Sequence, residues 1–497
     1  MMISRREFSR YLIGAAAVGL VDISVFSQLT GDPAKSIRRL ATATASGNGA
    51  WGDLRIEGKL PRDLNGTLFR TAPGESERFG VRLMHLFDGD AYVAGWEFRD
   101  GKASLRGRYI QSSGRVEERK AGKMLYNEYG THAPDSSRGS KNQPSVNIVE
   151  WNGKLLGLSE GSLPSIIDPR TFDLKGYESF GGVVPGHLTF TAHPRFDPTT
   201  GDMYAFGLEK RPPGTLNVVH VEKTSGKASI IYKIPQRGFN MIHDAMLTEN
   251  FFIVIVHPQS YDVEAMMSGK TMGEILRYDP KAPSILYAMP RSNADGKARF
   301  ITVELPPALV YHYGNAYEPE PGKIAFEMIA YNDAKTFEFL RNWRSDRQME
   351  FVRPRVKQTV VDLENRKHSA VEDLYEGAEF PRYDMRLTGK RARYLYVADR
   401  LYEEDAAIVR IDTRKRSSIK FNAGKERTLA EPVFVPKGEG KQSEDNGWLL
   451  IQGYDAARNE NFLEIRDAQT LGFQARIWAA GQHFPLGFHG NFVSSTT

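Results

Sequence analysis

Four histidines in this chain each lie in a short, distinctive context, and histidine is the commonest metal ligand among the side chains. They are too far apart in sequence for any two to share a helix face, which excludes the spacings of zinc proteases and zinc fingers. Imidazoles from distant segments can converge only where separate strands meet at a common axis. Such a site suits iron, copper, zinc or nickel. The four are His193 in Thr-Ala-His-Pro (191–194), His243 in Met-Ile-His-Asp (241–244), His312 in Tyr-His-Tyr-Gly-Asn-Ala-Tyr-Glu (311–318) and His489 in Gly-Phe-His-Gly-Asn-Phe (487–492).

The other histidines lack such contexts, and a single histidine in a strand-rich chain is usually a surface or core residue. His85 lies close to Asp88 and Asp90, a combination that could form a metal-binding loop. Asp-Gly-Asp is more typical of a tight turn between strands, so we predict a turn there. The histidines predicted not to bind metal are His85, His132, His187, His220, His257, His368 and His483.

The elements that would position the four histidines are predicted to be strands joined in hairpins. The clearest hairpin has a two-residue Asn152-Gly153 turn between two apolar runs. Units of apolar and polar alternation around an acidic turn recur near 196–206, 219–232, 409–421 and 463–478. Their irregular spacing favours diverged propeller blades over a solenoid. Helical periodicity is confined mainly to 263–276 and 333–343.

Longer motifs follow the same order as in a known family. They are Pro-Arg-Asp-Leu-Asn-Gly-Thr-Leu-Phe-Arg (61–70), His-Leu-Phe-Asp-Gly-Asp (85–90), Leu-Ser-Glu-Gly-Ser-Leu-Pro (158–164), Glu-Phe-Pro-Arg (379–382) and Glu-Pro-Val-Phe-Val-Pro (431–436). From about Leu60 to Phe492 the chain resembles the carotenoid cleavage oxygenases. The resemblance implies an all-β, seven-bladed β-propeller, with a cap of loops and short helices over one Fe²⁺ that the four histidines hold on the axis.

A neutral histidine ligand needs a partner on its second ring nitrogen, because that partner sets its tautomer and orientation. The resemblance implies that three glutamates serve this purpose and that His193 lacks a carboxylate partner. The implied pairs are Glu160 with His243, Glu379 with His312, and Glu431 with His489.

The implied reaction is the cleavage of a carbon–carbon double bond by dioxygen, which gives two carbonyl products. The sequence contains no convincing Ser-His-Asp set or paired carboxylates, and this reaction needs no general base. Two other functions stay open: a propeller that only binds an apolar ligand, and a metal-dependent isomerase on the same scaffold.

Within the family, substrates divide into long polyenes and phenolic stilbenes. Stilbene-cleaving members commonly have a lysine just before the glutamate that corresponds to Glu160, and here Ser159 takes that place. We therefore predict an apocarotenoid-like polyene, with a lignostilbene-type substrate as the alternative. Aromatic candidates for the wall of a substrate tunnel are Phe79, Tyr109, Phe239, Tyr311, Tyr313, Phe484 and Phe488.

Composition is typical of a large globular protein: 497 residues, 40% hydrophobic, with a formal net charge of +5. Basic residues are interspersed with acidic ones, so nucleic acid is not an expected partner. With no cysteine, disulfides and thiolate ligands are excluded. The Met-rich segment 265–276 could contact a lipid surface, although its polar residues favour a cap helix.

The N-terminus has the pattern of a twin-arginine export signal. Arg5-Arg6 precedes the apolar stretch 11–20, and small residues at 41–45 offer an Ala-x-Ala cleavage site. The apolar stretch is much shorter than the roughly 20 residues of a membrane-spanning helix. We predict that residues 1–45 are a removed signal, that residues 46–497 form a single propeller domain, and that the protein is periplasmic or otherwise exported.

Overall fold

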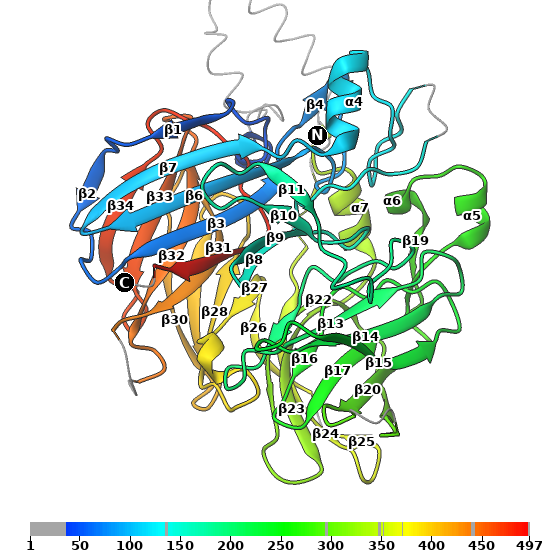
Figure 1. Cartoon of the computed structure of the whole chain (residues 1–497). Coiled ribbons are helices and arrows are strands. Elements are labelled where there is room, and N and C mark those ends of the chain that lie inside the picture. Colours follow the sequence, from blue (N-terminus) through cyan, green and yellow to red (C-terminus); the bar gives the residue numbers. More distant parts are fainter. Residues whose placement is uncertain are drawn as a thin grey trace, which may run out of the picture.

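The chain folds as a seven-bladed β-propeller, as predicted (Figure 1). The computed structural model describes residues 36–134, 138–293, 297–345, 349–350, 352–369, 371–438 and 443–495. Within these residues, seven antiparallel sheets of four or five strands surround a common axis. We number the blades I to VII along the chain and give their strands from the axis outwards.

The first three blades hold residues from the N-terminal half, together with the last strand of the chain. Blade I consists of β35 (Gly490–Ser494), β3 (Gly66–Pro73), β6 (Ala91–Arg99), β7 (Lys102–Tyr109) and β1 (Gly49–Trp51). Blade II consists of β8 (Asn147–Trp151), β9 (Lys154–Leu158), β10 (Ser165–Ile167) and β11 (Leu174–Tyr177). Blade III consists of β12 (Arg195–Phe196), β13 (Met203–Leu208), β14 (Thr215–Val221) and β15 (Ala228–Pro235).

The other four blades follow in chain order. Blade IV consists of β16 (Met246–Leu247), β17 (Phe251–Val256), β20 (Ser284–Pro290) and β21 (Ile301–Leu305). Blade V consists of β22 (Leu309–Tyr317), β23 (Lys323–Tyr331), β24 (Arg355–Asp362), β25 (Lys367–His368) and β26 (Glu372–Glu376). Blade VI consists of β27 (Ala378–Arg382), β28 (Tyr394–Asp399), β29 (Ala407–Asp412) and β30 (Ser417–Asn422). Blade VII consists of β31 (Arg427–Pro436), β32 (Gly447–Asp455), β33 (Glu460–Asp467), β34 (Phe473–Trp478) and β2 (Ile56–Gly58).

Both ends of the chain close the ring of blades. The C-terminal strand β35 pairs with β3 in blade I, and the N-terminal strand β2 pairs with β34 in blade VII. These exchanges join the first and last blades by hydrogen bonds, and closure of this kind leaves the sheets only short, protected edges.

The core consists of clusters of buried apolar side chains between neighbouring blades. Leu68 of blade I shares one cluster with Leu450 of blade VII, and Phe206 of blade III shares another with Phe252 of blade IV. Each of the other five blade interfaces has its own cluster. A middle strand is therefore covered on both faces, and β17 is a continuous apolar run rather than an alternating one.

Short helices and loops form the predicted cap and lie together in the upper and right part of Figure 1. They include α4 (Ser113–Ala121), α5 (Val263–Met267), α6 (Met272–Ile275) and α7 (Lys335–Arg341). Further elements of the described chain are α3 (Ile37–Ala41), the 3₁₀ helix η2 (Met385–Leu387) and the two-stranded sheets of β4 (Glu77–Arg78) with β5 (Val81–Arg82) and of β18 (Gln259–Tyr261) with β19 (Leu276–Tyr278). No helix among the described residues is long and apolar enough to span a membrane.

The predictions for local elements are confirmed for the hairpin and α7 but wrong in one detail. Asn152 and Gly153 both have positive φ and join β8 to β9, as a two-residue turn requires. The single helix predicted over 263–276 is two helices. Gly269, with a φ of 87°, turns the chain after α5, and a capping box of Thr271 and Glu274 then starts α6.

The boundary at residue 46 between a removed signal and the propeller domain stays a prediction. Residues 1–35, including Arg5 and Arg6, lie outside the described residues. Within the described residues, Ile37 and Ala41 of α3 are buried in a cluster of cap side chains. The indole Nε1 of Trp343 also donates a hydrogen bond to the Thr42 hydroxyl over 3.0 Å. Apolar burial therefore extends the fold to the start of α3.

Candidate metal centre

The four predicted histidines converge on the propeller axis from four different blades. His193 and His243 lie just before β12 and β16, the innermost strands of blades III and IV. His312 lies within β22 of blade V, and His489 directly precedes β35 of blade I. The innermost strands approach each other around the axis, so side chains more than 290 residues apart in sequence meet there.

Their Nε2 atoms face one another. The Nε2–Nε2 distances are 3.1 Å from His193 to His243, 3.2 Å from His243 to His312 and 3.1 Å from His312 to His489. All four ligand atoms lie within 4.8 Å of one another. Among the described residues, these four histidines are the group whose side chains could together hold a metal ion. All four side chains are nearly or fully withdrawn from solvent.

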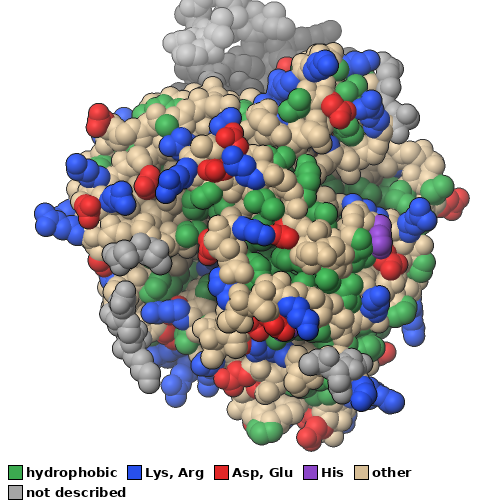
Figure 2. Space-filling model, viewed as in Figure 1, with side chains coloured by type: hydrophobic (Ala, Val, Ile, Leu, Met, Phe, Trp, Pro, Cys, Tyr) green, Lys and Arg blue, Asp and Glu red, His purple; other side chains and the backbone are tan. Residues whose placement is uncertain are grey.

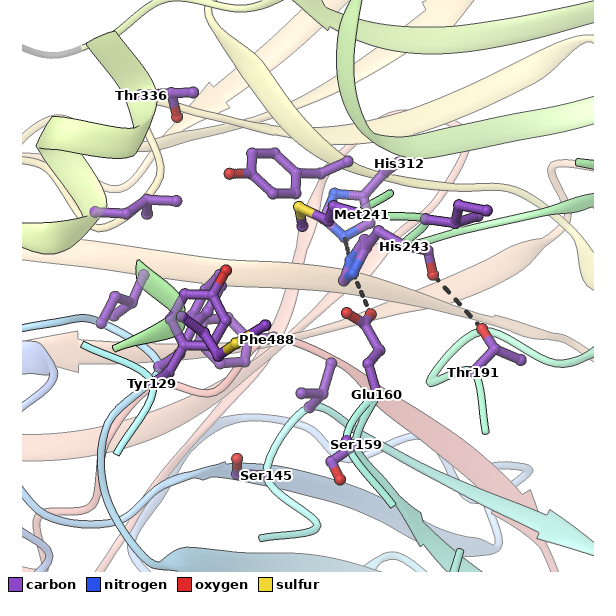
Figure 3. Close-up of a pocket in the computed structure, with 18 of the residues that line it drawn as sticks. Tyr129, Ser145, Ser159, Glu160, Thr191, Met241, His243, His312, Thr336 and Phe488 are labelled. Atoms are coloured by element: carbon purple, nitrogen blue, oxygen red, sulfur yellow. Dashed lines mark hydrogen bonds and ion pairs between the residues drawn. The ribbon is translucent and has the colours of Figure 1, made fainter. Parts of the chain in front are cut away.

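The three predicted glutamates contact the histidines in the predicted pairs. Glu379 accepts a hydrogen bond from Nδ1 of His312 over 2.7 Å, and Glu431 accepts one from Nδ1 of His489 over 3.0 Å. The Glu160 carboxylate points at His243 and contacts its Nδ1 (Figure 3). Glu379 and Glu431 lie on the innermost strands β27 and β31, whereas Glu160 lies in the loop after β9.

Among the described residues, no carboxylate lies within hydrogen-bonding distance of His193. The nearest one, Asp244, is 3.9 Å from its Nδ1. Asp244 is held instead by Arg195, at 2.7 and 2.9 Å, and by the backbone N–H of Tyr313 at 3.0 Å. The resemblance implied that His193, unlike the other three histidines, lacks a carboxylate partner, and the described residues agree with this.

The orientation of the rings leaves room for a cation between them. A carboxylate on Nδ1 holds the proton there, so the Nε2 atoms of His243, His312 and His489 present lone pairs to one another. Lone pairs that converge at 3.1–3.2 Å repel unless a positive ion lies between them. These spacings match adjacent ligands about 2.1–2.2 Å from one ion, close to metal–imidazole bond lengths. The donor set therefore fits a transition-metal ion.

Burial favours the neutral, ligating form of two of these histidines. It lowers the pKa of His489 to about 4 and holds the pKa of His193 well below its usual range. Burial acts in the same direction at His243, but the carboxylates of Glu160, Asp244 and Glu379 together outweigh it and raise the pKa of that imidazole.

Glu431 is the most strongly bound of the three carboxylates. Burial would raise its pKa, but Arg382, His489 and Arg70 together lower the pKa to about 2. Arg70 and Arg382 each reach Glu431 over 3.4 Å, and the backbone N–H of Gly490 donates to it over 3.0 Å. Glu431 is therefore a fixed negative charge beside the metal centre.

A cavity of about 490 Å³ opens onto the histidines and is walled mainly by apolar and aromatic side chains. His243, His312 and His489 lie in its wall, whereas the ring of His193 closes the cluster behind them. Figure 3 shows Met241 beside His243, and Tyr129 and Phe488 on the other side of the space that they enclose. A cavity of this size and character suits an apolar ligand.

Three of the seven aromatic residues predicted for the wall are in it: Phe239, Tyr311 and Phe488. The other four pack elsewhere, because aromatic residues also fill the interfaces between blades and the base of the cap. Tyr109 and Phe484 lie between blades I and VII, Tyr313 lies between blades IV and V, and Phe79 packs beneath the cap.

Sequence reasoning missed most of the wall contributed by the cap. Phe339, Leu340 and Trp343 follow one another along α7 and the loop behind it, at helical spacing. Met241, two residues before His243, lies in an irregular segment, so no periodic pattern marks it as part of the wall. Ser159 lies in the wall as well, with its hydroxyl 3.1 Å from that of Ser162.

Other histidines have local partners of their own. His257 lies between the hydroxyls of Ser284 and Tyr313, and His220 contacts Asp202. Nδ1 of His85 accepts the backbone N–H of Phe87 within the predicted turn. None of the three belongs to the ligand group found among the described residues.

Comparison with known proteins supports the same site. The model of the retinal pigment epithelial membrane protein family matches residues 44–494, which is nearly the whole described chain. The chain belongs to this family. Its curated relatives include carotenoid cleavage oxygenases, in agreement with the resemblance of the motifs.

Two relatives and one solved structure show the range of the family. The chain is 28% identical to apocarotenoid-15,15'-oxygenase of Synechocystis sp., over 88% of this chain and 92% of the relative. It is also 28% identical to resveratrol cleavage oxygenase 1 of Aspergillus fumigatus, again over 88% and 92%. The crystal structure of cobalt-substituted Synechocystis ACO matches with a TM-score of 0.83 at 26% identity, over 93% of this chain and 99% of that one.

Proposed function

We propose that this protein is a non-haem iron(II) oxygenase that cleaves a carbon–carbon double bond of an apolar alkene with dioxygen. The observation that carries the proposal is the convergence of four buried imidazoles on an apolar cavity, three of them in contact with carboxylates. Relatives that match nearly the whole chain are named as oxygenases of apocarotenoid and resveratrol. One alkene and one dioxygen balance two carbonyl products, so the reaction needs no other electron donor.

In this proposal the side chains hold the iron, orient the histidine rings and shield the site from water. Nε2 atoms of His193, His243, His312 and His489 would hold the iron, and Glu160, Glu379 and Glu431 would keep three of those rings in the ligating tautomer. The iron, when bound, supplies the centre at which dioxygen reacts with the alkene. The apolar wall contributes by excluding water and by positioning the double bond beside the histidines.

An apocarotenoid-like polyene is the preferred substrate in this proposal. The wall offers large apolar and aromatic side chains, and burial of apolar surface contributes about 25 cal/mol per Å² to binding. Ser159 can form one neutral hydrogen bond but cannot balance a phenolate as a lysine does. A stilbene remains the second candidate, because the hydroxyls of Tyr129 and Tyr261, 3.3 Å apart in the wall, could receive a phenol.

Oxygen consumption by the iron-loaded protein across a panel of polyenes and hydroxystilbenes tests the reaction, with products identified by mass spectrometry. We expect two carbonyl fragments per alkene and a higher kcat/KM for the polyene. Ser159→Lys should shift the ratio toward the hydroxystilbene. Uptake of substrate without oxygen consumption would indicate a binding protein, and a product of unchanged mass would indicate an isomerase.

Iron content tests the ligand set separately. Replacing any one of the four histidines by alanine should abolish iron retention, since no other imidazole can take its place among the described residues. His220→Ala is the matched control, because His220 lies in β14 of blade III, contacts Asp202 and is not part of the ligand group. Full iron in two or more of the ligand variants would refute the assignment.

We also propose that the protein is exported through its N-terminal twin-arginine pattern. A second proposal is that the cap contacts a lipid surface. Met267 and Val263 of α5 expose apolar side chains next to Met266 of the cavity wall. On the face seen in Figure 2 the charges of both signs are interspersed, so this contact would rest on apolar insertion. Met267→Ser should weaken sedimentation with vesicles of neutral lipid, whereas Ile419→Ser, an exposed apolar residue on blade VI, should not.

A further inference from the structure

Among the described residues, five acidic or basic side chains, histidines apart, line the cavity, and four of them contact an ionisable partner. Glu160 contacts His243, and Glu379 pairs with His312. Lys141 and Glu128 belong to a buried network in the cap: Lys141 contacts Asp90, Glu118 and Glu128, and Glu128 contacts Arg78. These four charges are therefore satisfied within the protein.

The fifth is Lys210, whose ammonium group makes no ion pair or hydrogen bond with any described residue. Its side chain is largely exposed, yet it also lines the cavity, so it lies at the mouth. Partial burial lowers the pKa of this ammonium, and no carboxylate contributes in the opposite direction. Lys210 is thus a partly desolvated cation to which the described part of the chain offers no counterion.

The backbone directs Lys210 to this position. Phe206, Leu208 and Lys210 alternate along β13 and its extension, and all three line the cavity. The extended geometry continues past the end of β13, because Leu188 bridges to Glu209 and the Lys210 N–H donates to the carbonyl of His187 over 3.1 Å. In a strand every second side chain points to the same face. Along this one strand, the side chains in the cavity wall change from aromatic to aliphatic to cationic.

We propose that Lys210 is a specificity-determining residue that binds a carboxylate at the end of the substrate. The inference rests on the proposed oxygenase function and narrows its substrate to apolar alkenes that end in a carboxylic acid. A long apolar chain would occupy the inner wall while its acid group meets Lys210 at the mouth. A carboxylic acid is ionised at neutral pH, whereas a phenol or alcohol is not, so the cation favours the acid over both.

Two polyenes of equal length test this proposal, an apocarotenoic acid and the corresponding alcohol. Lys210→Met keeps the apolar stem and removes the charge, and Lys210→Arg keeps the charge. Lys154→Met is the matched control, because Lys154 is also an exposed lysine but pairs with Glu178 away from the cavity. Binding is measured on the metal-free chain through quenching of tryptophan fluorescence, since Trp343 lies in the cavity wall. Turnover is measured on the iron-loaded chain.

We expect Lys210→Met to raise the Kd and KM for the acid on the order of tenfold, the size of one lost charged hydrogen bond, with kcat unchanged. The alcohol should bind equally well to the unmodified protein and to the Lys210→Met variant. The Lys210→Arg variant should retain most of the preference for the acid. High salt should weaken the preference of the unmodified protein, because the ammonium is exposed. Equal effects on acid and alcohol, or no effect on either, would overturn the role of Lys210. Failure of the unmodified protein to cleave either polyene would instead count against the oxygenase function, and the binding measurements would still test Lys210.

Discussion

Glu160 and Glu431 have the same predicted task, yet the structure predicts different consequences when each is replaced by glutamine. Within the described chain, His243 is the one ionisable residue that Glu160 contacts, and the Glu160 side chain is 31% exposed. Glu431 is 1% exposed and neutralises Arg70 and Arg382 in addition to orienting His489. Loss of the charge at Glu431 therefore leaves the buried guanidinium of Arg70 and the partly buried one of Arg382 without their carboxylate.

The magnitudes separate stability from metal binding. Breaking a buried ion pair by neutralising one partner costs about 3–5 kcal/mol, so Glu431→Gln should lower the free energy of unfolding of the metal-free protein by that amount. Glu160→Gln should lower it by less than about 1 kcal/mol, because a partly exposed pair contributes little. Both substitutions should weaken metal retention by roughly 10–100-fold, the usual effect of removing an orienting carboxylate.

Urea unfolding of chelator-treated protein measures the first quantity, and metal titration measures the second. Glu464→Gln is the matched control: Glu464 is 1% exposed and pairs with Arg466 and Arg476 within blade VII, away from the histidines. It should destabilise the fold as much as Glu431→Gln but leave metal affinity unchanged. An equal loss of stability in the Glu160 and Glu431 variants, or a loss of metal affinity in the Glu464 variant, would refute this reasoning.

Three further predictions concern the ends and the core of the chain. Ile37→Ala should lower the free energy of unfolding by about 2–4 kcal/mol, because Ile37 is buried in the cap cluster, whereas Val116→Ala at an exposed site should change it by less than about 0.5 kcal/mol in the same urea assay. Burial raises the pKa of Glu327 from 4.5 to about 7, so the unfolded chain releases this proton at a lower pH than the folded chain does. The free energy of unfolding should therefore fall by about 3 kcal/mol as the pH rises from 4.5 to 7, and Glu327→Gln should abolish that fall. An unchanged pH profile of the urea midpoint in the variant would contradict this. Replacing Arg5 and Arg6 together by lysine should leave unprocessed, folded protein in the cytoplasm, as fractionation and immunoblotting would reveal, and normal delivery to the periplasm would mean that the leader is misread.

Local features of the structure could be predicted from the sequence wherever one short segment contains the whole physical cause. The Asn152-Gly153 turn is an example, because both residues tolerate the positive φ that a two-residue hairpin turn demands. The four histidines are another, since each is marked by its own neighbours. The number of blades was not readable from periodicity. Strands such as β17 are buried on both faces and lose the alternation that marks a strand with one solvent face. That number followed from the family resemblance instead.

The chain by itself determined which residues can ligate a metal and orient the ligands, since only certain side chains have the required lone pairs and charges. Tertiary structure alone decided what surrounds them. Phe484 and Phe488 lie four residues apart in one irregular segment, yet Phe484 fills a blade interface and Phe488 lines the cavity. Lys210 is 51 residues from Ser159 in sequence, but both are in the same wall. A cavity wall is assembled from many segments whose relative positions depend on closure of the whole ring, and no local pattern carries that information.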